Sequence, residues 1–204
     1  MYHHDGYLEI ILGTMFSGKT SYLLHKISVM TELNLKVLYI NINFDDRSND
    51  NYSTHNPFLN SLDYKNKEKI LQNLTMIKIN NLMKIDNELI ENIDIVMIDE
   101  SQFFSDLVEF TNILLEKKKN VFIASLIADF TGGKFGLALD LIPICDSVIK
   151  LNSYCSECVK NKQYNKAIYS KKNEDNFNKQ NKIDKIDIGG SDKYTAVCRF
   201  HNKN

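Results

Sequence analysis

The sequence has no apolar stretch long enough to cross a membrane as a helix. Its longest apolar runs, such as VFIA (121–124), are far shorter than the roughly 20 residues that such a helix needs. No charged segment followed by an apolar core opens the chain, so we expect no secretory signal. The formal net charge is −1, without the basic excess of duplex-DNA binders. We therefore predict a cytoplasmic protein with no stable nucleic-acid or membrane partner.

Glycine is also scarce, at 8 of 204 residues, yet Gly13 and Gly18 both lie in GTMFSGKT (13–20), which we call the glycine loop. A β-rich run precedes this loop, and we expect a helix over 19–33. The loop fits G-x-x-x-x-G-K-[ST], in which backbone N–H groups surround a phosphate, the lysine reaches the β- and γ-phosphates and the hydroxyl ligates Mg²⁺. The alternative is a plain glycine turn with an incidental lysine. We predict that ATP contacts Gly13, Thr14, Met15, Phe16, Ser17, Gly18, Lys19 and Thr20.

A second acidic element follows the nearly continuous apolar run in IDIVMIDE (93–100). If this run is a strand of a parallel sheet, its carboxyl end opens toward the ligand. Asp99 then suits a Mg²⁺ contact, and Glu100 suits a general base. The alternative is a pair of acids that caps the next helix. The attacking group stays open: water would make an NTPase, whereas a substrate hydroxyl would make a small-molecule kinase.

The cysteine pattern predicts a metal site near the end of the chain. Cys155 and Cys158 form C-x2-C, and Cys198 and His201 form C-x2-H. Two such pairs separated by a loop are typical of tetrahedral Zn²⁺ with a structural role. Disulfides are uncommon in the reducing compartment that we expect, which favours metal over cross-links. The alternative is unligated cysteines beside an exposed histidine.

The order of the elements predicts an α/β fold. Expected strands alternate with helices, which indicates a mostly parallel, P-loop NTPase-like sheet flanked by helices. We place this ATP-binding domain at 1–150 and a smaller zinc lobe at 151–204. Two polar stretches, 45–67 and the Asn/Lys-rich 160–187, are predicted to be loops. The expected strands are 7–12, 36–42, 75–79, 93–100, 121–126 and 147–151.

Three motifs in one chain resemble the zinc-containing, cytosolic-type thymidine kinase family: MFSGKT (15–20), DESQFF (99–104) and GGSDKYTAVCR (189–199). The resemblance implies transfer of the ATP γ-phosphoryl group to the 5′-hydroxyl of thymidine, giving dTMP, in a homotetramer. Glu100 matches the catalytic base of the family. Asp45 and Arg47 match an active-site pair that acts near the transferring group.

The resemblance also implies a nucleoside pocket. FTGGKFG (130–136) matches a lasso-like segment that closes over the base, and the glycines in it differ from many relatives. Asn165 stands where many relatives have a small hydroxyl residue near the thymine methyl group, which leaves thymidine and deoxyuridine both open. Rival functions are a catalytically silent nucleotide-binding regulatory module and an NTPase that acts on nucleic acid. The implied base contacts are Met15, Phe103, Leu126, Phe130, Phe135, Asn165 and Tyr194.

Overall fold

The structure is a computed structural model, and it describes residues 5–43, 64–173 and 193–203. The predicted active-site pair Asp45 and Arg47 lies outside these residues, so both assignments stay predictions. In the described part of the chain, no helix combines the length and apolarity that a membrane span requires.

The chain divides into two compact units. The first comprises Met1–Ile11, Thr20–Ser125 and Gly136–Ile149. The second contains Lys150–Asn204 together with two earlier segments, Leu12–Lys19 and Leu126–Phe135. Most of the glycine loop and the predicted lasso thus group with the C-terminal region. The predicted domains, 1–150 and 151–204, stay a prediction.

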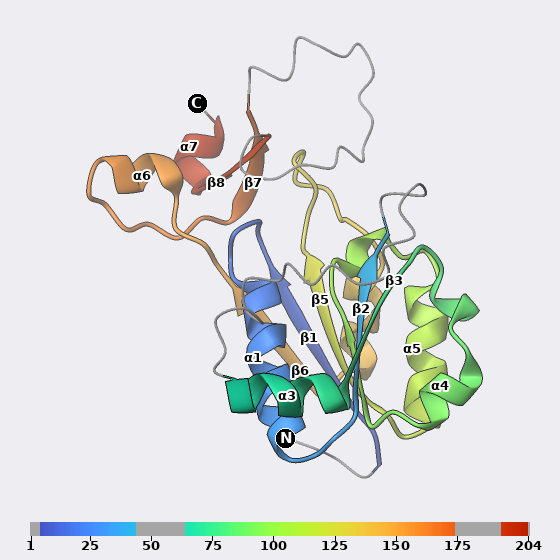
Figure 1. Cartoon of the computed structure of the whole chain (residues 1–204). Helices are drawn as coiled ribbons and strands as arrows, with labels where there is room; N and C mark the ends of the chain where they lie inside the picture. Colours follow the sequence, from blue (N-terminus) through green and yellow to red (C-terminus); the bar gives the residue numbers. More distant parts are fainter. Residues whose placement is uncertain (1–4, 44–63, 174–192, 204) are drawn as a thin grey trace. The chain divides into compact units, whose positions relative to one another are not determined.

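A six-stranded, mostly parallel sheet forms the centre of the first unit, with the order β3-β2-β4-β5-β1-β6 (Figure 1). The pairings of β2 with β3, β2 with β4 and β4 with β5 are all parallel. This confirms the predicted fold class. The strands are β1 (Tyr7–Gly13), β2 (Val37–Ile42), β3 (Leu74–Ile79), β4 (Ile95–Ile98), β5 (Asn120–Leu126) and β6 (Ser147–Leu151).

The central strands are apolar on both faces because helices flank the sheet (Figure 1). All of β4 is buried, as is β5 up to its last residue. Local capping defines short helices: the Asp86 side chain accepts from the N–H of Glu88 at the start of α4, at 2.9 Å. Among the described residues, this unit contains the helices α1 (Lys19–Glu32), α3 (Tyr64–Asn73), α4 (Asn87–Glu91) and α5 (Leu107–Glu116), with 3-10 turns η1 (Leu82–Lys84), η2 (Ser101–Phe103) and η3 (Ala138–Ile144).

The C-terminal part of the second unit is a small antiparallel hairpin with two short helices. Strand β7 (Tyr169–Lys172) pairs with β8 (Tyr194–Val197), and the helices are α6 (Ser156–Lys160) and α7 (Arg199–Lys203). The core of this region is small, formed by the buried residues Cys155, Cys158, Ala167, Ala196 and Val197. So few apolar side chains give little burial energy, which favours an additional stabilising element such as a metal.

Two predicted loops were wrong in part. The loop predicted over 45–67 gives way to helix α3 at Tyr64, because the lysines of this segment, with Glu68, Leu71 and Gln72, favour a helix and Ile70, only 1% exposed, anchors it. The loop predicted over 160–187 contains strand β7, whose register is set by pairing with a distant strand. Residues 174–187 of that loop lie outside the described residues.

Candidate active site and metal cluster

The glycine loop connects the end of β1 to the start of α1, as predicted. At Gly13 any side chain is excluded, since a Cβ would lie 2.3 Å from Ser17 Oγ and 2.9 Å from the Leu151 carbonyl oxygen. Gly18 has φ +87°, a left-handed conformation that glycine adopts without strain. The loop therefore needs a glycine at both positions, each for its own steric reason.

Within this loop, Lys19 folds back over the backbone. Its side chain is buried, and Nζ donates to the Thr14 carbonyl oxygen at 2.9 Å. The Ser17 hydroxyl donates to the same oxygen at 2.8 Å. The amide of Met15 donates to the Ser170 hydroxyl on β7 at 3.0 Å. Ser170 was not predicted, and its link to the loop depends on a contact between residues 155 positions apart, which no local pattern indicates.

Asp99 and Thr20 lie together in the first unit. Asp99 directly follows β4 and is 1% exposed, and its Oδ2 accepts from the Thr20 hydroxyl at 2.8 Å. Oδ2 also accepts from the Tyr39 hydroxyl at 2.7 Å, and Oδ1 accepts from the Glu100 amide at 2.9 Å. A carboxylate and a hydroxyl are the hard oxygen ligands that Mg²⁺ prefers, so the donor set fits the predicted metal.

Glu100 has an unusual backbone conformation. Its φ of 50° and ψ of 39° place it in the left-handed region, where a non-glycine residue carries strain of about 1–3 kcal/mol. Such strain is concentrated at functional sites. The Gln102 amide donates to Glu100 Oε2 at 2.6 Å, and Gln102 itself is 5% exposed. The carboxylate of the predicted base is therefore held by a buried side chain that sequence reasoning missed.

Gln102 is in turn held by close backbone packing. Gly136 has φ +71°, and a Cβ there would lie 2.5 Å from Gln102 Cα and 2.7 Å from its carbonyl oxygen. The Gln102 Oε1 also accepts from the Ser125 hydroxyl at 3.5 Å. Gln102, which orients Glu100, is therefore held both by Ser125 near the end of β5 and by Gly136, the last residue of the lasso.

The candidate base-binding residues fall in both units. Phe103 belongs to the first, where it is partly buried in η2. In the second unit, Asp129 organises the lasso, since its Oδ1 accepts from the amides of Thr131 and Gly133 and from the Thr131 hydroxyl. Lys172 Nζ lies 5.7 Å from the centre of the Phe130 ring. The remaining candidates of this unit are the partly buried Met15, Leu126, Phe130 and Phe135 and the buried Tyr194.

Asn165 lies beside the cysteines in the second unit. Its side-chain amide donates to Cys158 Sγ at 3.3 Å, and its backbone carbonyl oxygen accepts from the backbone amide of Cys155 at 2.8 Å. Its role as a base contact stays a prediction. The contact that the structure gives it is with a candidate metal ligand.

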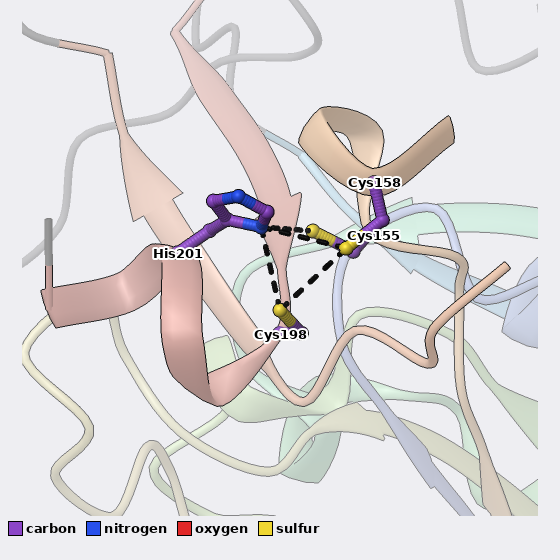
Figure 2. Close-up of side chains that lie close together, drawn as sticks. All are labelled: Cys155, Cys158, Cys198 and His201. Carbon is purple, nitrogen blue, oxygen red and sulfur yellow. Dashed lines mark hydrogen bonds between the residues drawn. The ribbon is translucent and has the colours of Figure 1, made fainter. Parts of the chain in front are cut away.

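The four predicted metal ligands converge, as Figure 2 shows. Cys155 and Cys158 lie at the start of α6 and within it, Cys198 follows β8, and His201 lies on α7. His201 Nδ1 is 3.3, 3.5 and 3.4 Å from the sulfurs of Cys155, Cys158 and Cys198, and the last two sulfurs are 3.9 Å apart. All four ligand atoms lie within 4.8 Å of one another.

These separations fit a tetrahedral zinc ion. With bonds of about 2.3 Å to sulfur and about 2.0 Å to nitrogen, neighbouring ligand atoms are about 3.5–3.8 Å apart. Burial opposes ionisation of Cys155, but the backbone groups of Cys158 and Cys198 and the His201 side chain lower its pKa to about 6. A low pKa favours the thiolate, which is the form that binds metal. The cluster could hold zinc.

A profile of thymidine kinases matches residues 6–202. The chain belongs to the thymidine kinase family. This confirms the resemblance read from the three motifs, and with it the prediction that the chain is a kinase of this type. The match spans both units of the structure, from the start of β1 to helix α7.

Individual thymidine kinases align over nearly the whole chain. The thymidine kinase of Amsacta moorei entomopoxvirus is 36% identical, covering 95% of this chain and 96% of the relative. That of Choristoneura fumiferana entomopoxvirus is 35% identical, covering 97% of each. The cytosolic thymidine kinase of Homo sapiens is 31% identical, covering 96% of this chain and 72% of the human protein.

Proposed function

We propose that the protein transfers the γ-phosphoryl group of ATP to the 5′-hydroxyl of thymidine and so produces dTMP. The observation that carries the proposal is the thymidine kinase match over residues 6–202. Asp99 accepts hydrogen bonds from both Thr20 and Glu100 within one unit, which supports the proposal. Phosphoryl transfer needs a metal-binding pair and a proton acceptor close together.

In this proposal the glycine loop binds the ATP phosphates. Its amides and the Lys19 ammonium group supply positive charge, and the positive end of α1 adds to it. Lys19 would exchange its contact with the Thr14 carbonyl for phosphate oxygens. Thr20 and Asp99 would hold Mg²⁺, directly or through water. Bound Mg²⁺ supplies charge neutralisation to the phosphates during transfer.

Glu100 acts as the general base. Its carboxylate accepts the proton of the 5′-hydroxyl while the new O–P bond forms and the bond to the β-phosphate oxygen breaks, releasing ADP. Gln102 orients the Glu100 carboxylate through the 2.6 Å hydrogen bond to Oε2. Asp45 and Arg47 are proposed to assist near the transferring group.

For the nucleoside base we propose contacts with residues of the glycine loop, the lasso and the hairpin. Phe103 is a further candidate from η2. The Asp129-centred turn gives the glycine-rich lasso a defined shape, which suits base recognition by its backbone groups. The other proposed contacts are Met15, Leu126, Phe130, Phe135, Tyr194 and Asn165.

We further propose that the cysteine cluster holds a structural Zn²⁺, that the protein acts in the cytoplasm and that it forms a homotetramer. The cluster geometry supports the zinc. The relatives from Homo sapiens and Bos taurus are named cytosolic thymidine kinases, which supports the location. The tetramer rests on the family resemblance alone.

The test is to compare Glu100→Gln with the matched variant Glu109→Gln, which changes an exposed glutamate in the first turn of α5. Glu100→Gln should lower kcat for dTMP formation by about 10²- to 10⁴-fold while the Kd for ATP stays within about twofold of wild type. Glu109→Gln should match wild type. A Glu100→Gln enzyme with an unchanged kcat would refute the assignment of the base.

A further inference from the structure

Tyr39 makes a hydrogen bond that the roles assigned so far do not use. It lies in the middle of β2, is 4% exposed, and its hydroxyl donates to Asp99 Oδ2 at 2.7 Å. The same oxygen accepts from the Thr20 hydroxyl at 2.8 Å. The oxygen that Thr20 contacts is therefore also fixed from the sheet side, by a residue on a neighbouring strand.

The support for Tyr39 is rigid. Its strand lies between β3 and β4, and Tyr39 stands opposite Met76 on one side and Met97 on the other. The carboxylate torsion of an aspartate is broad, so Asp99 held by Thr20 alone could rotate over a wide range of angles. With Tyr39 on Oδ2 and the Glu100 amide on Oδ1, the plane of the carboxylate is fixed.

Packing alone does not call for a hydroxyl at this position. Val37, which lies on the same face of β2, is aliphatic and fully buried. The hydroxyl is used instead by the 2.7 Å hydrogen bond that it donates to Asp99 Oδ2.

We propose that Tyr39 is a positioning residue that holds Asp99, and through it Thr20, in the orientation that binds Mg²⁺·ATP. This inference rests on the proposed function, in which Thr20 and Asp99 hold the metal. It predicts an effect on metal-dependent nucleotide binding, which a purely structural tyrosine would not have.

The experiment measures ATP binding by calorimetry, once with Mg²⁺ and once with EDTA, in wild type, Tyr39→Phe and Tyr22→Phe. Tyr22→Phe is the matched control, because it removes a tyrosine–carboxylate hydrogen bond of 2.9 Å to Glu9 in the same unit. Mg²⁺ should strengthen ATP binding to wild type. In Tyr39→Phe this strengthening should fall by about fivefold to tenfold, while binding in EDTA stays the same. Tyr22→Phe should keep the wild-type ratio.

A double-mutant cycle with Asp99→Asn tests the route of the effect. If Tyr39 acts through Asp99, Tyr39→Phe should change the Mg²⁺ ratio little in the Asp99→Asn background. If Tyr39→Phe does not fold, Tyr39→Leu repeats the measurement with an aliphatic residue like the neighbouring Val37.

The results of these binding measurements distinguish a failure of the inference about Tyr39 from a failure of the proposed kinase function. A Tyr39→Phe protein with the wild-type Mg²⁺ ratio, even one that is less stable, would overturn the inference and leave the kinase proposal intact. A wild-type protein whose ATP affinity ignores Mg²⁺ would overturn the magnesium site, and the inference with it.

Discussion

Gly136→Ala should impair both stability and turnover, because Gly136 packs directly on the backbone of Gln102. The new Cβ would lie 2.5 Å from Gln102 Cα and 2.7 Å from its carbonyl oxygen, and neither atom belongs to a flexible side chain. Gly136 also has φ +71°, which costs an alanine about 1–2 kcal/mol. Relief of the clash adds about 1–3 kcal/mol, so unfolding free energy should fall by about 3 kcal/mol in total.

Gly132→Ala separates the two contributions. Gly132 has φ +84°, but its Cβ would meet only the Tyr169 ring, at 4.0 Å. This variant should therefore lose about 1 kcal/mol from backbone strain and nothing from overlap. Urea unfolding of both variants, monitored by circular dichroism, gives the difference between them.

Turnover provides the second readout for Gly136→Ala. Movement of Gln102 would disturb the 2.6 Å hydrogen bond that holds Glu100, and small displacements of a catalytic group are costly. We expect kcat to fall about tenfold or more in the fraction that remains folded. A variant as stable as Gly132→Ala, with wild-type kcat, would refute the link from Gly136 through Gln102 to Glu100.

Three further predictions concern the second unit. Prolonged treatment with a strong chelator should remove zinc and lower the melting temperature, and added Zn²⁺ should restore the original melting temperature. A protein that is isolated without zinc and whose melting temperature does not respond to the chelator would contradict the site. Asn165→Ala should speed chelator-induced zinc release about tenfold by removing the hydrogen bond to Cys158, while Asn161→Ala, whose amide donates to a helix carbonyl, should release zinc at the wild-type rate. Ser170→Ala should lower the unfolding free energy by about 1 kcal/mol, because it removes the acceptor of the Met15 amide. Urea unfolding measures this change, and an unchanged unfolding free energy would show that the contact contributes nothing.

Structural elements whose signal lies in one short, continuous stretch of residues were predictable from the sequence. Strand β6 begins and ends where the apolar pattern of 147–151 places it, and helix α1 begins at Lys19 as expected. The glycine loop and the paired cysteine motifs carry their chemistry in a fixed spacing. Local patterns of this kind survive folding because each one satisfies its own backbone geometry or ligand geometry.

Features that depend on distant contacts were not predictable. Tyr39 resembles an ordinary buried strand residue until Asp99, 60 positions later, is placed beside it. Ser170 has no sequence signal that links it to the glycine loop. The hydrogen bond from Asn165 to the Cys158 sulfur likewise has no local sequence signal, and the base contact that the family resemblance implies for Asn165 stays a prediction.

The most direct test of the central claim is the product balance of purified protein with ATP and Mg²⁺, with and without thymidine. We expect ADP to form only when thymidine is present and dTMP to appear in equal amount. ADP formation at the same rate without any nucleoside, and no dTMP with it, would contradict the claim that this chain is a thymidine kinase.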